Sequence, residues 1–398
     1  MTSRLVVAVR NDLTRDNRAR KMAASFTDAG WSVVRLGIRT SLSQPTDENT
    51  PHGQLHRIAT TRHFSNDSPT TPSSASKVST NAAALIAIRQ ALGRLRDSVL
   101  YFRHILRIAP SAVVVMNADL GPLVWLLRHL SRVVVVYDAR ELWVEQWPDA
   151  HTVYRVLFGA FERAALRSAH TNIAVNALIA DELSRRYHVS APLAVHNGPG
   201  ECAGVDREVA APIRLLFQGS FAADRSVDAF IRAMPDLRGI AHLTLQGFGG
   251  SEMRLRSLAT ELDVTDIVTF ADPVAPESIV LAASHHDLGL VPTGLECSNL
   301  LLSSPNKVFD YLGGGLALLV PDFPFMETLI RDFECGVIVA MDDPAAISSA
   351  VRQLAEDSRR LRVMRANARR ACDRYLWDRQ AHVLLRAVGQ ASRKGDPT

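Results

Sequence analysis

Short runs of aliphatic and β-branched residues alternate with segments of helical periodicity along most of this chain, and no other feature restricts its fold as strongly. In the first half, the runs are followed by polar turns or by helical patterns such as Asn17–Ala29. Such alternation is typical of a parallel sheet that is covered by helices. The runs that we predict to be strands are Leu5–Val9, Trp31–Leu36, Ala112–Met116, Val133–Tyr137 and Asn172–Val175.

The same alternation begins again after the cluster Asn197-Gly198-Pro199-Gly200. The chain has 398 residues, and that length suits two domains of about 150–200 residues better than one core. We therefore predict an α/β fold with an N-terminal domain over residues 1–200, a C-terminal domain over 201–376 and a final segment over 377–398. The strands predicted in the second domain lie at 213–218, 242–246, 267–270, 288–291 and 317–320.

The alternation is lost between about residues 40 and 81. The stretch Phe64–Asn81 is rich in Ser, Thr, Pro and Asn and nearly lacks apolar residues. Such a segment buries too little apolar surface to pack by itself. Because predicted strands lie on both sides of it, we expect a mobile surface loop over residues 40–81 and not a linker between domains.

The composition is that of a globular protein with a mild positive charge. Hydrophobic residues make up 47% of the chain and charged residues 22%, and the formal net charge is +4. This excess does not resemble a nucleic-acid-binding arm, but it is compatible with anionic small substrates or an anionic membrane surface. No uncharged apolar run reaches the ~18 residues of a transmembrane helix. We expect a cytoplasmic protein, with peripheral contact on the inner face of the membrane left open.

The four cysteines are widely spaced in the sequence. They form no Cys-x-x-Cys pair, and no cluster of histidines lies near them. This spacing favours free thiols in a reducing compartment over disulfides or a metal site. We therefore expect free thiols at Cys202, Cys297, Cys335 and Cys372.

A long amphipathic helix is predicted over residues 82–108. Arg89, Arg96, Arg103 and Arg107 fall on one side of it, beside an apolar face, as the helical period requires. The basic side either leans on an anionic membrane or a lipid-phosphate acceptor, or it is the solvated side of a packed helix. The apolar face consists of Ile88, Leu92, Leu95, Val99, Phe102 and Leu106.

Two glycine-containing turns follow predicted strands of the second domain. Open α/β sheets bind ligands beyond the carboxyl ends of their strands, and glycine lets a ligand approach the backbone closely. Gly219 and Ser220 follow the first strand, and Arg225 stands where the next helix begins. Gly247 and Gly249 follow the second strand. These turns either contact a nucleotide or are simply tight connections.

A third turn opens the helix that begins near Pro305. Pro305 is suited to the first helical position and Ser304 to the N-cap. The amides of Asn306 and Lys307 would then favour an anion at the helix start, and Lys307 adds a full charge. Asp310 lies one turn further on, where its carboxylate is able to accept hydrogen bonds from ribose hydroxyls. The alternative is an exposed helix start with a weak Lys–Asp pair.

Polar side chains also follow strands of the first domain. Asp16 and Arg18 come after the first strand, and Asp138, Arg140 and Glu141 come after the run that ends at 137. Charged groups in such positions are hard to explain as core residues. We expect them to face a ligand.

These segments resemble the retaining glycosyltransferases of family 4, in particular the branch that acts in bacterial surface-polysaccharide assembly. The similarity extends over nearly the whole chain and is most specific in the run from Pro305 to Leu312. It implies the GT-B fold, with two Rossmann-like domains that face each other across a cleft and a last helix that crosses back to the first domain. The other segments that carry it are Asp16–Arg18, Tyr137–Leu142, Val195–Pro199, Gln218-Gly219 with Arg225, Asp287–Pro292 and Tyr375–Trp377.

The resemblance implies transfer of a sugar from a UDP- or GDP-linked donor to the hydroxyl of a glycan, lipid-linked or small-molecule acceptor, with retention. Arg225 and Lys307 would act on the leaving diphosphate, and Arg140 and Glu141 on the sugar. No cofactor, metal or nucleic acid is expected, since the sequence has no Asp-x-Asp motif. The implied nucleotide contacts are Gly219, Ser220, Gly247, Gly249, Pro305, Asn306 and Asp310, and Asp16, Arg18 and Asp138 lie on the acceptor side.

Three positions depart from the family pattern. Asp310 stands where the family usually has Glu, Leu302 replaces an earlier Glu, and Arg140 replaces a His of an Asp-x-His-Glu motif. Two alternatives to transfer therefore stay open. One is a non-catalytic protein that binds sugar nucleotides, and the other is a sugar-nucleotide 2-epimerase of the same fold.

Overall fold

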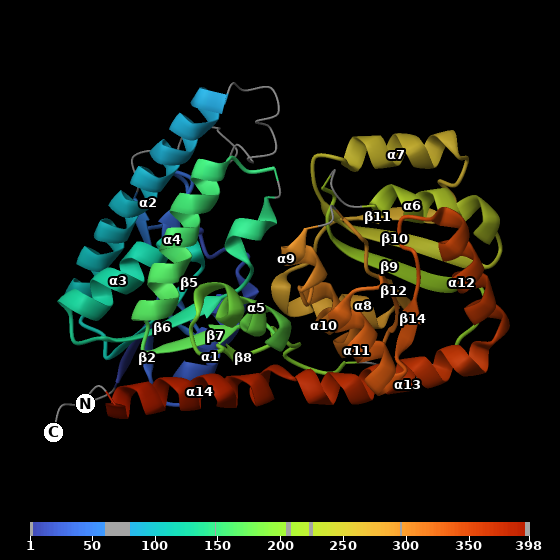
Figure 1. Ribbon diagram of the computed structural model, residues 1–398. Helices are drawn as coiled ribbons and strands as arrows, with labels where there is room; N and C mark the ends of the chain where they lie inside the picture. The colour runs from blue at the N-terminus through green and yellow to red at the C-terminus, as the bar shows by residue number, and fades with distance from the viewer. Residues whose placement is uncertain are drawn as a thin grey trace. The chain divides into compact units, whose positions relative to one another are not determined.

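The computed structural model divides the chain into two compact units, each built around one β-sheet (Figure 1). It describes residues 3–59, 80–147, 149–203, 208–222, 226–294 and 297–394. The first unit comprises Met1–His196, Cys297–Asn299 and Gln380–Thr398, and the second comprises Asn197–Glu296 and Leu300–Arg379.

The sheet of the first unit has eight strands in the order β3-β4-β2-β1-β5-β6-β7-β8. Its strands are parallel except for β3, which pairs antiparallel with β4. The central strand β1 pairs on both sides, so that Val6 lies opposite Val34 and Val113. The strands are β1 (Arg4–Ala8), β2 (Ser32–Arg39), β3 (Asp47–Thr50), β4 (Gly53–Ala59), β5 (Ala112–Met116), β6 (Val134–Ala139), β7 (Thr171–Ala174) and β8 (Leu193–Ala194).

A layer of helices covers one face of this sheet. Helix α2 (Thr80–Ile108) connects β4 to β5, α3 (Gly121–Leu130) connects β5 to β6, and α4 (Thr152–Ser168) connects β6 to β7. All three connections move in the same direction across the sheet, and right-handed crossovers place such helices on the same face. The helices pack against one another. The remaining helices of this unit are α1 (Asn17–Asp28), η2 (Ala118–Leu120), η3 (Trp143–Gln146) and α5 (Ala177–Tyr187), and α14 (Trp377–Lys394) belongs to this unit from Gln380 on.

The second unit has a parallel six-stranded sheet in the order β11-β10-β9-β12-β13-β14. Its core is formed by buried residues such as Phe217, Leu243 and Leu319. The strands are β9 (Ile213–Ser220), β10 (Ala241–Phe248), β11 (Val268–Ala271), β12 (Leu288–Leu290), β13 (Ala317–Val320) and β14 (Gly336–Ile338). The helices are α6 (Val227–Ala233), η4 (Met234–Leu237), α7 (Glu252–Glu261), η5 (Pro276–Ser278), α8 (Ile279–Ser284), α10 (Asn306–Gly314), α11 (Pro324–Phe333), α12 (Pro344–Glu356) and α13 (Ser358–Tyr375). Helix α9 (Ser298–Leu301) is divided between the units after Asn299.

The predicted α/β architecture is confirmed, but the expected loop over residues 40–81 is wrong in part. Strands β3 and β4 occupy 47–59, and β4 pairs parallel with β2. The alternation in β4 is hard to recognise because Arg57 is buried beside Leu55 and Ile58. Residues 60–79 lie outside the described part of the chain. None of the helices in the described part is long and apolar enough to cross a membrane.

The expectation of four free thiols is also corrected. Cys202 and Cys372 form a disulfide within the second unit, whereas Cys297 and Cys335 are free. The two bonded residues are 170 positions apart, and sequence spacing does not reveal such a pairing because the fold alone brings the segments together. Disulfides are rare in reducing compartments, so this bond is unusual for the reducing compartment that the cysteine spacing favoured.

We predict that the non-reduced, denatured protein exposes two titratable thiols and that the reduced protein exposes four. Cys202→Ser should destabilise the second unit by about 2–5 kcal/mol, because the crosslink restricts the unfolded chain. Thiol titration and urea unfolding measure the two effects, and Cys297→Ser is the matched control. Four reactive thiols without reductant would contradict the bond.

A buried carboxyl group links the helix α4 to the segment after β6. Glu162 is 1% exposed, and it accepts hydrogen bonds from the Tyr187 hydroxyl at 2.7 Å and from the Trp143 amide at 3.4 Å. Burial raises the pKa of Glu162 to about 7, although the hydrogen bond from Tyr187 acts in the opposite direction. The folded state therefore prefers the protonated acid.

We predict that Glu162→Gln stabilises the first unit at pH 8 but not at pH 4.5. The folded-state pKa exceeds the unfolded value, so the folded state holds an extra proton between these pH values and the wild type loses stability as pH rises through that window. A pKa of about 7 against the ordinary value of 4.5 corresponds to roughly 3 kcal/mol at pH 8. Urea unfolding at both pH values is the measurement. An equal effect of the exposed control Glu261→Gln, or a difference independent of pH, would contradict it.

Candidate functional site

The strand order of the second unit changes direction between β9 and β12. The chain proceeds from β9 to β10 on one side, whereas β12 and β13 lie on the other. In open α/β sheets, the carboxyl ends of strands at such a switch point border the ligand crevice. The Gly219 turn follows β9 at this position, and α10 lies in the connection between β12 and β13.

Lys307 lies beside the turn that follows β9. A Cβ atom placed on Gly219 would be 3.4 Å from Lys307 Nζ, and that Nζ is 4.7 Å from the centroid of the Phe217 ring. Gly219 has a φ of 148°, which residues with a side chain rarely adopt. Glycine therefore leaves room for the lysine side chain, and the structure brings together two residues that the sequence predicted for one site.

The start of α10 differs by one residue from the prediction. Pro305 has a ψ of 136° and is the N-cap, so the helix begins at Asn306 and Ser304 does not cap it. Proline fixes φ but leaves ψ free, so an extended proline can precede a helix. Asn306 is exposed, and its Oδ1 accepts a hydrogen bond from Asn197 Nδ2 at 2.9 Å. Helix starts of this kind favour an anion through the amides and the helix dipole.

Tyr311 fixes α10 against the strands at the switch point. Its hydroxyl accepts a hydrogen bond from the Gln218 amide at 2.8 Å and donates to the Leu290 carbonyl at 3.4 Å. Burial raises the pKa of Tyr311 well above its ordinary value, so the hydroxyl stays protonated. The ring occupies the space in which Gly289 has no side chain. Tyr311 lies within the run from Pro305 to Leu312 that carries the family resemblance, but the sequence predicted no role for it.

The second glycine turn packs backbone to backbone on the first. A side chain on Gly247 would meet the Gly219 carbonyl, and one on Gly249 would meet the Phe221 backbone. The Phe221 amide donates to the Phe248 carbonyl at 2.9 Å. Gly247 and Gly249 are therefore accounted for by the close packing of two connections, which was one of the two interpretations left open.

The other residues predicted for this site vary in exposure. Ser220 is exposed, and Asp310 is half-buried on α10, three positions after Lys307. Leu302 is half-buried. Arg225 lies outside the described residues.

In the first unit, the strand order changes direction between β1 and β5. Arg18 follows β1 on helix α1, and its guanidinium makes two hydrogen bonds to the Asp138 carboxylate of β6, at 2.7 and 2.9 Å. A third hydrogen bond reaches the Val195 carbonyl at 2.8 Å. Arg18 is 1% and Asp138 0% exposed. Their burial differs from the expected contact with an acceptor, because each satisfies the other.

Asp16 and Arg140 form a second pair at the same edge, with Arg140 Nη1 at 2.7 Å from Asp16 Oδ2. Asp16 also caps α1 through the Ala19 amide and accepts a hydrogen bond from Asn11 Nδ2. Burial alone would raise the pKa of Asp16, but the Arg140 charge and these hydrogen bonds outweigh it, and the pKa lies below its ordinary value. Arg140 is half-buried and the neighbouring Glu141 is exposed, so these two are open to a ligand.

A second polar cluster follows β1 and β5, and sequence reasoning missed it. Arg10 after β1 contacts Asp97 of α2 at 2.9 Å and Asp119 of η2 at 3.9 Å. Arg94 lies 3.8 Å from Asp119. Burial raises the pKa of Asp119, although Arg94 and Arg10 lower it. The polar residues after β5 were a signal, because β5 borders the switch point.

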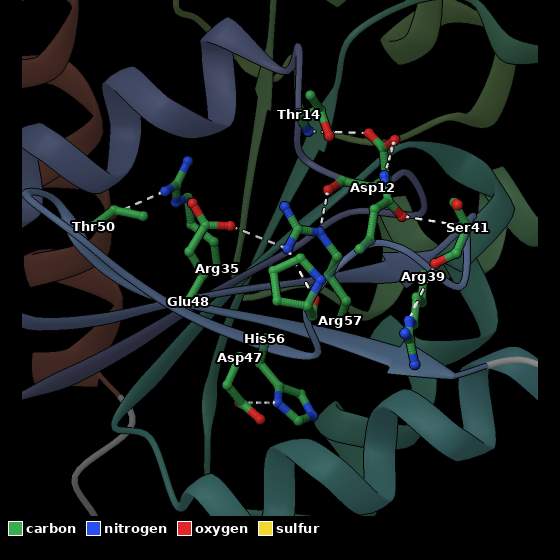
Figure 2. A network of polar contacts seen from close by, with 12 residues as sticks. Asp12, Thr14, Arg35, Arg39, Ser41, Asp47, Glu48, Thr50, His56 and Arg57 are labelled. Atoms are coloured by element: carbon green, nitrogen blue, oxygen red, sulfur yellow. Dashed lines mark hydrogen bonds and ion pairs between the residues drawn. The ribbon is translucent and has the colours of Figure 1, made fainter.

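The turn between β1 and α1 is held by a network that Figure 2 shows. Arg57 Nε donates to the Asp12 carbonyl at 2.9 Å, and its Nη1 lies 3.2 Å from a Glu48 carboxylate oxygen. The Asp12 carboxylate accepts hydrogen bonds from Gln44 at 2.8 Å and Thr40 at 3.1 Å. This network fixes the segment that positions Asp16. Among the described residues, no three His, Cys, Asp or Glu side chains gather into a metal site.

The domain around Lys307 matches a known family. Residues 212–357 match the family model described as glycosyl transferases group 1. This stretch includes the Gly219 turn, the Gly247 turn and the whole of α10.

Two curated relatives are D-inositol 3-phosphate glycosyltransferases. Those from Acidothermus cellulolyticus and Nocardia farcinica are 27% and 28% identical over 202 and 187 residues. The matches cover 47% and 44% of this chain and 44% and 40% of the relatives. The chain thus spans less than half the length of the curated relatives it matches.

Solved structures are similar over nearly the whole chain. Sucrose-phosphate synthase from Thermosynechococcus elongatus has a TM-score of 0.73 at 16% identity and covers 98% of both chains. An E. coli trehalose-6-phosphate protein, solved with UDP-2-fluoro glucose, has a TM-score of 0.68 at 10% identity and covers 98% of this chain and 99% of its own. WaaG, a glycosyltransferase involved in lipopolysaccharide biosynthesis, has a TM-score of 0.66 at 16% identity and covers 95% and 99%.

At these identities the structural likeness concerns the fold, while the family model concerns the domain that holds Lys307. The chain therefore has a two-unit α/β fold of the GT-B type, and its residues 212–357 match the family model of the group 1 glycosyltransferases.

Proposed function

We propose that this protein moves a sugar from a nucleotide diphosphate sugar to an acceptor hydroxyl, with retention at the anomeric carbon. One observation carries the proposal. Lys307 Nζ lies beside the Gly219 turn, at the switch point of a domain that matches group 1 glycosyltransferases. A cation and a helix start at a switch point suit a diphosphate.

The chemistry follows from where charge develops. As the glycosidic C–O bond breaks, the sugar becomes oxocarbenium-like and negative charge builds on the departing diphosphate. Donors aimed at that charge lower the barrier because they interact more strongly with the transition state than with the substrate. Lys307 and the amides at the start of α10 supply these donors, with Arg225 as a second cation. The Asp310 carboxylate accepts hydrogen bonds from the ribose.

The first unit contributes the sugar and acceptor contacts in this proposal. Arg140 and Glu141 face the donor sugar, and Asp16 holds Arg140 through their ion pair at 2.7 Å. Arg18 and Asp138 act as positioning residues, since their mutual pair is buried. The reaction needs no bound metal, because Lys307 and Arg225 carry the positive charge that a metal would otherwise bring.

The acceptor class that we propose is a glycan or lipid-linked intermediate of bacterial surface-polysaccharide or glycoconjugate assembly. We propose a cytoplasmic enzyme in which the Cys202–Cys372 bond persists, although disulfides are rare in reducing compartments. WaaG is named for lipopolysaccharide biosynthesis, and the curated relatives are named for an inositol phosphate. A lipid-linked acceptor is anchored in the membrane, so the enzyme must reach the membrane surface to bind it. Peripheral contact with the inner face of the membrane through α2 is therefore part of the proposal.

The test is incubation with UDP-, GDP- and dTDP-sugars, with and without a mixture of glycan and lipid-linked acceptors, and in the presence or absence of EDTA. We expect nucleotide release from one donor that depends on an acceptor and survives EDTA. Conversion of the donor to an isomeric sugar would establish the epimerase instead. Binding without turnover would establish the non-catalytic alternative, and loss of activity with EDTA would contradict the metal-free mechanism.

We predict that Lys307→Met lowers kcat by roughly 10²–10³, because the variant keeps the side-chain stem against Phe217 but removes the charge on the leaving diphosphate. Steady-state kinetics with the identified donor measure the effect. Arg256→Ala is the matched control, since it removes a cation that lies 4.4 Å from the Phe270 ring centroid. A near-normal kcat in Lys307→Met would remove Lys307 from the mechanism.

A further inference from the structure

The outer surface of the helical layer α2, α3 and α4 carries positive charge without exposed carboxylates. The three helices contain nine arginines but only two acidic residues, Asp97 and Glu162. Both acidic residues are 1% exposed. Among the described residues, no carboxylate pairs with Arg89, Arg103, Arg107, Arg128 or Arg163. This face therefore presents unneutralised cations to whatever contacts it.

The same surface exposes an apolar stripe along α2. Ala87, Ala91, Tyr101 and Ile105 form the buried side of the helix. The opposite side is apolar as well, with exposed fractions between 42% at Leu95 and 67% at Leu85. Isolated exposed leucines are ordinary, but a continuous apolar stripe marks a contact surface. The exposed stripe consists of Leu85, Ile88, Leu92, Leu95, Val99 and Leu106.

This stripe corrects one interpretation of the helix over residues 82–108. The basic side was expected to be solvated while the apolar side packed on the protein. In the structure, the packed side combines Tyr101 and Ile105 with small and polar residues such as Ala87, Asp97 and Ser98, and most of the larger aliphatic residues remain outside. The apolar face is thus available for another partner.

A second copy of this chain fits the stripe poorly. The exposed residues recur at alternating spacings of three and four, as in a coiled-coil seam. However, Arg89, Arg96 and Arg103 flank that seam at every e position of the heptad. Antiparallel pairing of two such helices would place arginine against arginine, and parallel pairing would oppose them with Ala91 and Ser98, which are buried in this fold. The charge pattern requires an anionic partner.

The groove between α3 and α4 has the same character. It encloses about 610 Å³ and is lined by Trp125, Arg128, Arg163 and Arg167 together with small residues. Trp125 is 46% exposed and stacks on His129 at 4.8 Å between ring centroids. Trp favours the interface between water and lipid, and several arginines without a carboxylate suit a phosphate group. On α4, Val156 adds an exposed apolar side chain.

We propose that the outer face of α2, α3 and α4 docks on an anionic phospholipid membrane. The aliphatic stripe of α2 enters the interface between headgroups and acyl chains, the arginines beside it contact lipid phosphates, and the α3–α4 groove holds one headgroup. Amphipathic helices bind membranes through this combination of apolar area and positive charge. The inference deepens the membrane contact included in the proposed function and rests on it there, but it concerns a surface and not the reaction, so vesicle binding tests it separately from sugar transfer.

The experiment is co-sedimentation of the full chain with vesicles of phosphatidylcholine alone or with about 30 mol% phosphatidylglycerol. We expect binding only to the anionic vesicles, with weakening at high salt. Each arginine near the surface contributes about fivefold. The triple variant Arg89→Ala, Arg103→Ala, Arg107→Ala should therefore bind roughly 100-fold more weakly, and Arg128→Ala with Arg163→Ala roughly 25-fold more weakly.

Matched controls separate this face from general charge and hydrophobicity. Arg254→Ala, Arg359→Ala and Arg362→Ala together remove the same charge from exposed positions on α7 and α13 and should leave binding unchanged. Leu92→Asp should weaken binding about tenfold or more, whereas Met253→Asp should not. Lys307→Met should bind as the wild type does, which distinguishes this inference from the proposed catalysis.

Three outcomes would overturn the proposal. The first is absence of binding to anionic vesicles by the wild type. The second is equal loss of binding in the control triple variant. The third is a wild-type dimer, detected by light scattering, that dissociates in Leu92→Asp while vesicle binding stays unchanged, because the face would then join two copies of the chain.

Discussion

The hydroxyl of Tyr311 fixes the geometry on which the candidate site of the second unit depends. It bonds to the Gln218 amide at the end of β9 and to the Leu290 carbonyl at the end of β12. These are the two strands between which the sheet changes direction, so one side chain ties α10 to both strands at the switch point. Because Gly289 leaves space for the ring, the helix start lies close enough for Lys307 to reach the Gly219 turn. The buried contacts of Tyr311, one helical turn after Lys307 on α10, thus fix the position of the Lys307 ammonium group.

The first unit uses buried charge in a comparable way. Arg18 and Asp138 join α1 to β6 with no exposed atoms of consequence. Breaking such a pair leaves an unpaired buried charge, which costs about 3–5 kcal/mol. Its proximity to Asp16 and Arg140 means that the pair fixes α1, and α1 in turn fixes the carboxylate that holds Arg140. Conserving this geometry requires Arg18 and Asp138 whether or not either touches a ligand, so a motif residue need not be a contact residue.

Much of the fold follows from local patterns, and the failures have physical causes. Strand β13 has the predicted limits, because an uninterrupted aliphatic run is a local signal. Strand β4 was missed because Arg57 is buried. Its guanidinium donates a hydrogen bond to the Asp12 carbonyl and forms an ion pair with Glu48, and the local sequence around Arg57 does not reveal the distant partner Asp12. The Cys202–Cys372 bond and the Asp97–Arg10 contact depend on the fold in the same way. Lys307 was found since its signal, a proline before a helix, is local.

Helix α2 shows a further limit of periodicity. Its apolar repeat identified a helix correctly, but a repeat does not say which of two apolar faces meets the protein. Ala87 and Ala91 let α2 approach α4 closely, and Tyr154 and Phe158 fill the space beside them. The side of α2 with small residues therefore makes the internal contact with α4, and most of the larger aliphatic residues of α2 lie outside, although Ile105 is buried. Leu85 and Leu92 are exposed, so polar residues at these positions would cost little folding stability. The aliphatic residues there therefore call for another explanation. Arg89, Arg103 and Arg107 lie beside the apolar stripe and pair with no carboxylate in the described part of the chain, so a partner that is both apolar and anionic explains this face.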